Sequence, residues 1–353
     1  MNITEALIGW YEKNKRPLPW RETCDPYKIW ISEVILQQTR VEQGTSYYFR
    51  FLEKFPTLER LANASEQEVL QLWQGLGYYS RARNMHHTAQ TLLEKHNGQF
   101  PKSKVELKKL KGIGAYTAAA IASLCFDEAV AVVDGNVERV LSRIFAVDLL
   151  VDTQQGKKAI QALANSLMDV KVPGVFNQAM MELGARVCTP RNPDCVLCPV
   201  SFSCEAMRLG QTGEYPKKSL KKPPTKRYLN YLVIILSKDN ASYVLMRKRT
   251  GEDIWKNLYD FPCVETEQET DLDEVLALAV KDALFPSEGN FKTNTSEIYK
   301  HQLSHRLLLA KFTQVMVRDI SWAKEGLIPI KIHETACVPL PRLIEKYWER
   351  ELL

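Results

Sequence analysis

Residues 107–121 read LKKLKGIGAYTAAAI. This stretch predicts a helix, a tight turn at Gly112 and Gly114, and a second, alanine-rich helix. The glycines let the backbone turn sharply and bring its N–H groups close to an anion at the N-terminus of the second helix. A DNA phosphate would suit that place, with Lys111 and its neighbours adding positive charge. The alternative is an ordinary helical hairpin with a solvated lysine face.

The composition of the 353-residue chain is that of a globular protein. Hydrophobic residues make up 45% and charged residues 25%, which excludes long disorder and fibrous repeats. The longest aliphatic run, residues 232–236, is too short to cross a bilayer, and residues 1–14 lack a signal-peptide core. We therefore expect a cytoplasmic protein that does not associate with membranes.

The sequence pattern changes from helical to β-prone after a basic linker. Up to about residue 187, apolar residues recur at spacings of three and four, for example over 27–39, 66–76, 115–125 and 137–145, which predicts helices. Residues 216–228 hold six Lys or Arg, three Pro and no acid, which is typical of an extended linker. Short β-prone runs follow at 229–236, 242–246 and 306–312, with a helical stretch at 271–284.

These patterns predict a multidomain α and α+β protein. We place an all-helical domain at residues 1–187, with the helical hairpin at about 105–126, and a cysteine loop at 188–204. A basic interdomain linker at 205–228 and a smaller α+β domain at 229–353 complete the chain.

Four cysteines lie within 17 residues: Cys188, Cys195, Cys198 and Cys204. In a reducing compartment such crowding indicates a metal site rather than disulfides. Four thiolates can surround a zinc ion or an iron–sulfur cluster. The spacing matches neither two zinc-ribbon pairs nor the ferredoxin pattern, so the residues alone leave the metal open.

Two carboxylates stand out by their surroundings. Three of the four helical neighbours of Glu33 are apolar, and burial against them would raise its pKa, as a general acid requires. The alternative is a partly exposed glutamate beside a core stripe, or one paired with Lys28 or Arg40. Asp134 precedes a predicted helix, where it is either simply an N-cap or a second carboxylate kept ionised by the helix N–H groups. One neutral acid beside one charged acid is what glycoside chemistry uses.

Residues 75–83, GLGYYSRAR, place apolar and aromatic side chains on a glycine-flanked turn beside two arginines. Such a tip can enter a base stack and hold a duplex open. Alternatively, its aromatic rings are anchored in the protein core.

Taken in order, these motifs resemble the helix–hairpin–helix DNA glycosylase superfamily and, within it, the MutY family of adenine DNA glycosylases. The similarity is carried by LPWR (18–21), WISEVILQQTRV (30–41), GLGYYSRARN (75–84), VDGNV (133–137) and FNQAMMELG (176–184). The C-terminal part resembles a degenerate MutT, or Nudix-like, domain. The resemblance implies base excision repair of double-stranded DNA in which adenine is paired with 8-oxoguanine or guanine. It also implies a structural 4Fe-4S cluster on the four cysteines. We expect the protein to act as a monomer.

The resemblance also implies roles for single residues. Glu33 would protonate the leaving adenine, and Asp134 would stabilise or covalently trap the sugar cation. Tyr116 would assist at the sugar, and Asn136 would orient the aspartate. The expected adenine-pocket residues are Trp20, Arg21, Leu36 and Gln178. Gln38 and Tyr78 would fill the gap in the duplex, with Thr39 and Leu76 on the side of the opposite base. Lys111, Gly112 and Gly114 would hold a DNA phosphate.

The sequence departs from the family's pattern in three places, and other functions compete with the one that the resemblance implies. In the MutY family a short Phe-Ser-His loop recognises 8-oxoguanine. Here the matching residues are Leu303, Ser304 and His305, so the strength of discrimination between 8-oxoguanine and guanine is in question. Lys111 stands where the hairpin usually has Pro. The Nudix catalytic carboxylates are missing, which argues against a pyrophosphohydrolase. Tyr116 replaces the lysine that bifunctional, endonuclease III-like relatives use for a Schiff base, and we therefore expect a monofunctional enzyme. The last competitor is a non-catalytic DNA sensor that carries the cluster.

Overall fold

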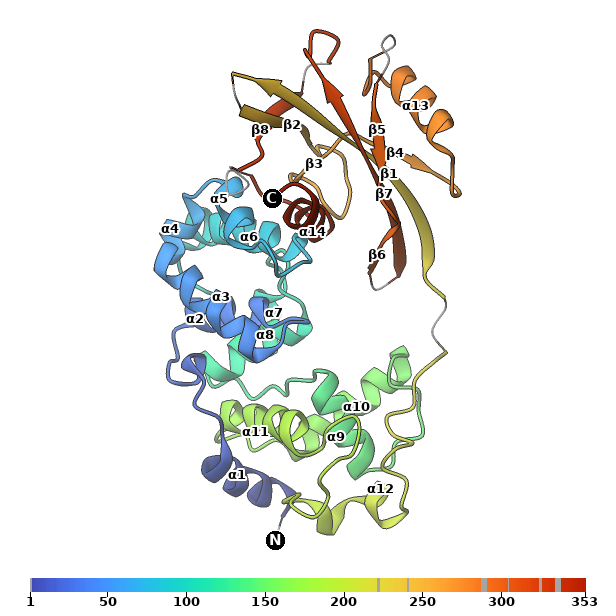
Figure 1. Ribbon diagram of the computed structural model, residues 1–353. Helices are drawn as coiled ribbons and strands as arrows, with labels where there is room; N and C mark the ends of the chain where they lie inside the picture. The colour runs from blue at the N-terminus through green and yellow to red at the C-terminus, as the bar shows by residue number, and fades with distance from the viewer. Residues whose placement is uncertain are drawn as a thin grey trace. The chain divides into compact units, whose positions relative to one another are not determined.

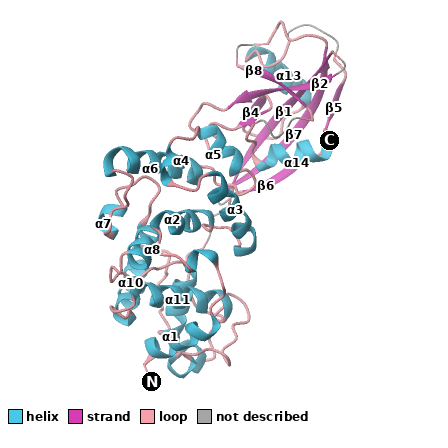
Figure 2. Ribbon diagram, turned by 90° about the vertical axis from the view of Figure 1, so that its left-hand side faces the viewer, coloured by secondary structure: helices cyan, strands magenta, loops and turns pink. Residues whose placement is uncertain are grey.

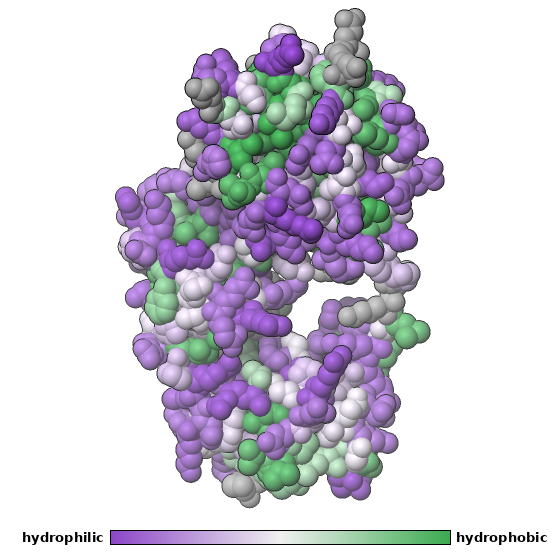
Figure 3. Space-filling model, in the orientation of Figure 1, coloured by the Kyte–Doolittle hydropathy of each residue, from purple (hydrophilic) through white to green (hydrophobic). Residues whose placement is uncertain are grey.

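The computed structural model describes residues 2–220, 223–239, 241–286, 291–303, 305–323, 326–333 and 338–353. Ser304 lies outside the described residues. The chain forms two compact units, one made of residues 1–63 and 84–221 and the other of residues 64–83 and 222–353. Within the described residues no helix is long and apolar enough to cross a membrane, and the face drawn in Figure 3 is mostly hydrophilic.

The first unit is helical (Figure 1). Its helices are α1 (Ile3–Asn14), η1 (Pro19–Arg21), α2 (Pro26–Ile35), α3 (Val41–Lys54), α4 (Leu58–Ala62), α7 (Lys104–Leu107), α8 (Ala115–Cys125), α9 (Gly135–Ile144), α10 (Gln154–Leu167), α11 (Pro173–Arg186), η2 (Ser201–Ser203) and α12 (Glu205–Arg208). Many begin at a side chain that accepts a backbone N–H, as at Asn2, Asp25, Asp134 and Thr153.

Helix α11 organises this unit because it packs against α1, α8 and α9. Leu7, Leu141 and Leu183, from α1, α9 and α11, are fully buried in the core that these helices share. One side of α11 is left outside this core and lines a cavity through Gln178, Met181 and Glu182.

The predicted hairpin is present as α7, a turn with Gly112 at φ +80°, and α8. Two predicted helices end earlier than expected, and one of them is the helix predicted over 66–76, which covers only Glu66–Leu72. The apolar pattern predicted a helix over 27–39, but α2 ends at Ile35, and Gln38 takes a φ of +57°, which no helix allows. The four residues after α2 therefore form a loop.

The second unit is built on a mixed β-sheet (Figure 2). Its elements are α5 (Glu66–Leu72), β1 (Thr225–Lys238), β2 (Ala241–Lys248), β3 (Tyr259–Asp260), β4 (Cys263–Thr266), α13 (Leu272–Lys281), β5 (Thr293–Thr295), β6 (Tyr299–Gln302), β7 (Arg306–Val317), β8 (Leu327–Lys331) and α14 (Arg342–Glu351), and α6 (Ser80–His96) runs from this unit into the first. The long strands β1 and β7 pair in parallel, from Thr225 opposite Arg306 to Leu236 opposite Val317.

The two faces of this sheet bury different side chains, because successive residues of a strand point to opposite sides. Leu232 and Ile234 face Val275 and Ala279 of α13. On the other side the Phe312 ring stacks on Tyr347 of α14 at 4.0 Å. The described residues thus confirm the predicted order, a helical region followed by an α+β region.

Candidate active site

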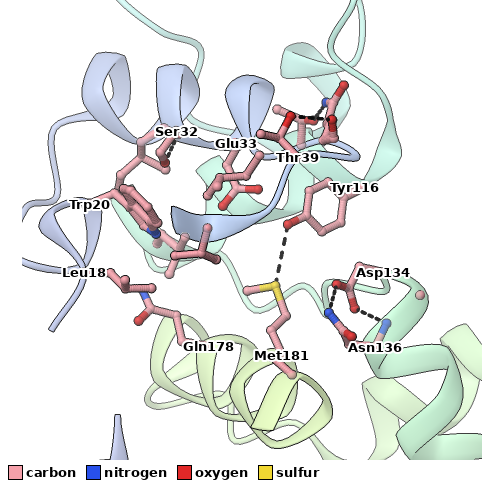
Figure 4. A pocket seen from close by; sticks show the side chains of 18 of the residues that line it. Leu18, Trp20, Ser32, Glu33, Thr39, Tyr116, Asp134, Asn136, Gln178 and Met181 are labelled. Carbon is pink, nitrogen blue, oxygen red and sulfur yellow. Dashed lines mark hydrogen bonds between the residues drawn. The ribbon is translucent and has the colours of Figure 1, made fainter. Parts of the chain in front are cut away.

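The loops around α2, α8, α9 and α11 enclose a cavity of about 730 Å³ in the first unit (Figure 4). Its lining includes most of the site residues predicted in this unit: Trp20, Arg21, Glu33, Leu36, Gln38, Thr39, Gly112, Gly114, Tyr116, Asp134, Asn136 and Gln178. Leu18, Met181 and Glu182 are among the other lining residues. Segments that are far apart in the sequence therefore line the same cavity.

Glu33 enters this cavity from the last turns of α2 and is 8% exposed. Burial raises the pKa of Glu33 from its usual 4.5 to about 7. The Tyr116 hydroxyl opposes this rise by favouring the charged form, and the negative charge of Asp134 adds to it. A carboxyl with this pKa holds a proton for a large part of the time near neutral pH, as a general acid must.

Tyr116 lies in the first turn of α8 and points into the cavity between Glu33 and Met181 (Figure 4). Its hydroxyl donates to Met181 Sδ at 3.6 Å. Burial, and then the charges of Glu33 and Asp134, raise the pKa of Tyr116 well above its usual range. The residue therefore offers a neutral hydroxyl to the cavity.

Asp134 caps α9, as the simpler interpretation of the sequence predicted, and also lines the cavity. Its Oδ1 accepts the backbone N–H groups of Asn136 at 2.9 Å and Val137 at 2.8 Å. The side-chain amide of Asn136 donates to the other carboxylate oxygen at 2.8 Å. Three N–H donors and a helix N-terminus favour a negative charge at this position.

Two buried features hold Asn136 in place, and sequence reasoning missed both roles. The Arg139 guanidinium donates to Asn136 Oδ1 at 2.9 Å and to the carbonyls of Cys188 and Gly184, each at 2.7 Å. Gly184 on α11 permits the approach, because a Cβ there would lie 2.6 Å from Asn136 Cβ. The only sequence signal for Arg139 is its place one helical turn after Asn136.

The side of the cavity lined by Trp20, Arg21 and Gln178 is built around a buried carboxylate that the sequence analysis did not single out. Glu182 on α11 accepts hydrogen bonds from Arg16 at 2.7 and 2.8 Å and from Arg21 at 2.7 Å. Burial alone would raise the pKa of Glu182, but these hydrogen bonds outweigh it and lower the pKa to about 2. Gln178 lies one turn earlier on α11 and accepts a hydrogen bond from the Tyr11 hydroxyl. Trp20 packs edge-on against Tyr48 at 5.4 Å.

The hairpin turn borders the same cavity through Gly112 and Gly114. Gly112 requires its φ of +80°, and a Cβ there would lie 2.6 Å from Asn84 Cβ. Gly114, the N-cap of α8, has no side chain that could accept from the first N–H groups of the helix. Lys111, just before this turn, is exposed.

The four cysteines of the loop 188–204 are free thiols and half-buried. Burial raises the pKa of Cys198 to about 11, with the other three thiols adding to the rise. Arg143 donates to Cys188 Sγ at 3.3 Å and to the Thr189 carbonyl at 2.7 Å. Among the described residues, no group of three or more His, Cys, Asp or Glu side chains is arranged to hold a single metal ion.

Leu76, Tyr78 and His305 belong to the second unit. Leu76 is buried, Tyr78 is 47% exposed with a φ of +48°, and His305 is exposed at the start of β7.

Comparisons with known proteins agree with this arrangement. A family described as HhH-GPD superfamily base excision DNA repair protein matches residues 31–168, and a NUDIX domain matches residues 231–350. An adenine DNA glycosylase of Buchnera aphidicola subsp. Baizongia pistaciae is 33% identical over 97% of this chain and 94% of its own length. The chain belongs to the adenine DNA glycosylases.

Further adenine DNA glycosylases and related structures support this membership. The human adenine DNA glycosylase is 36% identical over 74% of this chain and 57% of its own length. A thermostable thymine-DNA glycosylase structure is 28% identical, with a TM-score of 0.55 over 58% of this chain and 95% of that chain. The predicted family and fold class are therefore confirmed, and this adenine DNA glycosylase is an enzyme of base excision repair.

Proposed function

We propose that the enzyme hydrolyses the N-glycosidic bond of adenine paired with 8-oxoguanine or guanine in duplex DNA. The observation that carries this proposal is one cavity that holds a buried Glu33 with a pKa of about 7 and an Asp134 carboxylate held by three N–H donors. Two carboxyl groups in different surroundings, one buried and one held by hydrogen bonds, are what glycoside hydrolysis uses.

Glu33 donates its proton to a ring nitrogen of the flipped adenine, which turns the base into a good leaving group. The bond from the sugar to the base then breaks, and its electron pair leaves with adenine. Asp134 stabilises the positive charge on the sugar, or traps it as an ester, until water adds to the same carbon. Asn136 keeps the aspartate oriented, and the neutral Tyr116 hydroxyl assists at the sugar.

Trp20, Arg21, Leu36 and Gln178 form the adenine pocket in this proposal. They line the cavity beside Glu33, and Arg21 is fixed by the buried Glu182. A flipped purine would gain stacking from Trp20 and hydrogen bonds from Gln178, which repays part of the cost of unstacking it.

We propose four sets of DNA contacts. The N-terminus of α8, with Lys111, Gly112 and Gly114, binds a phosphate, supported by the glycine at its N-cap, which offers no side-chain acceptor to the first N–H groups. Gln38 and Tyr78 fill the gap in the duplex, supported by the positive φ of both residues, a strain typical of functional loops. Thr39 and Leu76 contact the opposite base. His305 and Ser304 recognise 8-oxoguanine, with Leu303 weakening that contact.

We propose that Cys188, Cys195, Cys198 and Cys204 hold a 4Fe-4S cluster. The donor set fits, because four thiols in one loop interact with one another and Arg143 donates to Cys188 Sγ. A cubane cluster needs its ligands farther apart than one metal ion does. When bound, the cluster would shape the loop 188–204 for DNA binding.

We further propose that the domain limits inferred from the sequence, 1–187, 188–204, 205–228 and 229–353, describe the functional parts. One cavity contains both acids, which supports action as a monomer. The substrate would be chromosomal, so we expect the enzyme to work at the nucleoid in the cytoplasm.

The test uses end-labelled duplexes with one adenine opposite 8-oxoguanine, guanine or thymine. The proposal predicts strand cleavage only after alkali, and only for the first two duplexes. Breaks without alkali would indicate a lyase, and intact DNA after alkali would contradict the proposal.

A further inference from the structure

The loop of residues 75–79, which leads into α6 at Ser80, is held by the C-terminal part of the chain. Residues 64–83 belong to the same compact unit as residues 222–353. Tyr79 is 2% exposed, and its hydroxyl donates to the Leu340 carbonyl at 2.8 Å in the buried interior, across 261 positions of sequence. That carbonyl is in a fixed position, because the neighbouring Pro339 accepts the Tyr259 N–H of β3 at 3.0 Å.

Three further hydrogen bonds flank this one. The Gln74 amide donates to Glu345 on α14 at 3.1 Å, and Arg342 holds the other oxygen of that carboxylate at 2.6 Å. Arg83 donates to the Lys256 carbonyl at 2.9 Å. At the start of α5, Glu66 accepts from the Asn257 amide at 2.5 Å. The residues before the loop therefore contact both the β2–β3 connection and α14, and Arg83 after the loop contacts the β2–β3 connection.

The loop itself is turned by local bonds. Trp73 Nε1 donates to the Gly77 carbonyl at 3.0 Å, and Arg81 donates to the same carbonyl at 3.2 Å. The Arg81 guanidinium lies over the rings of Trp73 and Tyr78, at 5.1 and 5.7 Å. Tyr78 lies between these local bonds and the anchored Tyr79. It is 47% exposed and has a φ of +48°. A side chain at such a φ keeps its place only if both flanks are fixed.

We propose that Tyr79 is a positioning residue through which the C-terminal unit sets the ring of Tyr78 for insertion into the duplex. This rests on the proposed role of Tyr78 in the base stack. The C-terminal unit then has two tasks: it recognises the opposite base, and it holds the side chain that opens the duplex. Tyr79 touches neither the adenine nor the sugar and acts through Tyr78 alone.

The test compares Tyr79→Phe, which removes only the hydroxyl, with Tyr299→Phe in the full-length chain. Tyr299 also donates to α14, to Glu351 at 2.9 Å, but outside the loop contacts. We expect Tyr79→Phe to slow single-turnover excision from an adenine:guanine duplex about threefold to tenfold, the size of one lost buried hydrogen bond. Tyr299→Phe should match the wild type.

A pre-opened substrate separates positioning from general damage. When the adenine:guanine pair stands between unpaired neighbouring bases, little unstacking remains to be done, and the Tyr79→Phe rate should return to that of the wild type. Fluorescence of 2-aminopurine beside the target adenine should rise more slowly for Tyr79→Phe on the closed duplex only. A deficit of equal size on both substrates, or no deficit on the closed duplex, would overturn the inference.

Tyr78→Ala tests the underlying function separately. If Tyr78→Ala slows excision from the closed duplex and Tyr79→Phe does not, the positioning role is wrong and the proposed function stands. If Tyr78→Ala has no effect on the closed duplex, the proposed role of Tyr78 fails, and this inference fails with it. A double-mutant cycle of Gln74→Ala and Glu345→Ala should show coupling in the same rate.

Discussion

Asp134 and Asn136 are joined by two hydrogen bonds, from the backbone N–H of Asn136 to Oδ1 at 2.9 Å and from its side-chain amide to Oδ2 at 2.8 Å. Arg139 determines which way that amide points, because it donates to Asn136 Oδ1. The carboxylate is therefore held at both oxygens and cannot rotate without breaking a bond. In the proposed mechanism, a negative charge fixed in this way would need no rearrangement when positive charge develops on the sugar.

The buried proton of Glu33 should influence stability as well as catalysis. Because the folded pKa of about 7 lies above the usual 4.5, stability from this group is complete below pH 4.5 and is lost as pH rises through 7. Glu33→Gln removes that loss, so it should be more stable than the wild type at pH 8 by at most about 3 kcal/mol, and nearly equal at pH 4.5. Urea unfolding at both pH values measures this. An equal difference at the two pH values would contradict the burial of the charge.

Tyr116 should decide whether the enzyme can form an imine. Tyr116→Lys places an amine beside the sugar, and burial keeps part of it neutral and nucleophilic. We expect borohydride to trap a covalent complex of this variant with DNA, and none with the wild type or with Tyr116→Phe. Trapping of wild-type protein at one specific lysine would show that the enzyme is not monofunctional.

The buried Glu182 should matter to both stability and the base pocket. Its carboxylate pairs with Arg16 and Arg21 and is 1% exposed. Glu182→Gln leaves the two cations without their counter-charge and should destabilise the fold by about 3 kcal/mol. Because its folded pKa is about 2, the stability it contributes is present above pH 4.5 and lost as pH falls toward 2.

The control for this substitution is the exposed pair of Glu205 and Arg208, where Glu205→Gln should leave the melting temperature unchanged. If the two substitutions have the same small effect, Glu182 is not the anchor of the pocket.

Leu303 should limit discrimination between opposite bases. Leu303→Phe restores an aromatic ring, and stacking should raise the preference for 8-oxoguanine over guanine about threefold to tenfold. Binding to duplexes with a non-cleavable adenine analogue measures the ratio. Leu303→Met is the control, with similar volume and no ring. The same ratio for all three proteins would remove this position from opposite-base recognition.

Local sequence chemistry predicted much of the fold and one side of the site. The glycines of the hairpin, the apolar spacing of α8 and the cap at Asp134 act over a few residues, so their sequence pattern is sufficient. Helix α2 was predicted four residues too long because the apolar pattern continues through Leu36, while only the tertiary structure forces the turn at Gln38.

The other side of the site depends on contacts between distant segments. Arg16 meets Glu182 across 166 positions, and Arg139 meets Cys188 across 49. No local pattern marks such pairs. The grouping of residues 64–83 with the C-terminal unit is of the same kind, because its contacts join distant segments, as the hydrogen bond from Tyr79 to Leu340 does.

The pH dependence of single-turnover excision, measured for the wild type and Glu33→Gln on an adenine:8-oxoguanine duplex, tests the central claim most directly. The account predicts that the wild-type rate falls as pH rises through about 7, where the buried carboxyl loses its proton. Glu33→Gln should bind the same duplex but be slower by about 10²- to 10⁴-fold, with no such pH dependence. A variant that excises adenine at nearly the wild-type rate, with the same decline above pH 7, would contradict the assignment of Glu33 as the acid.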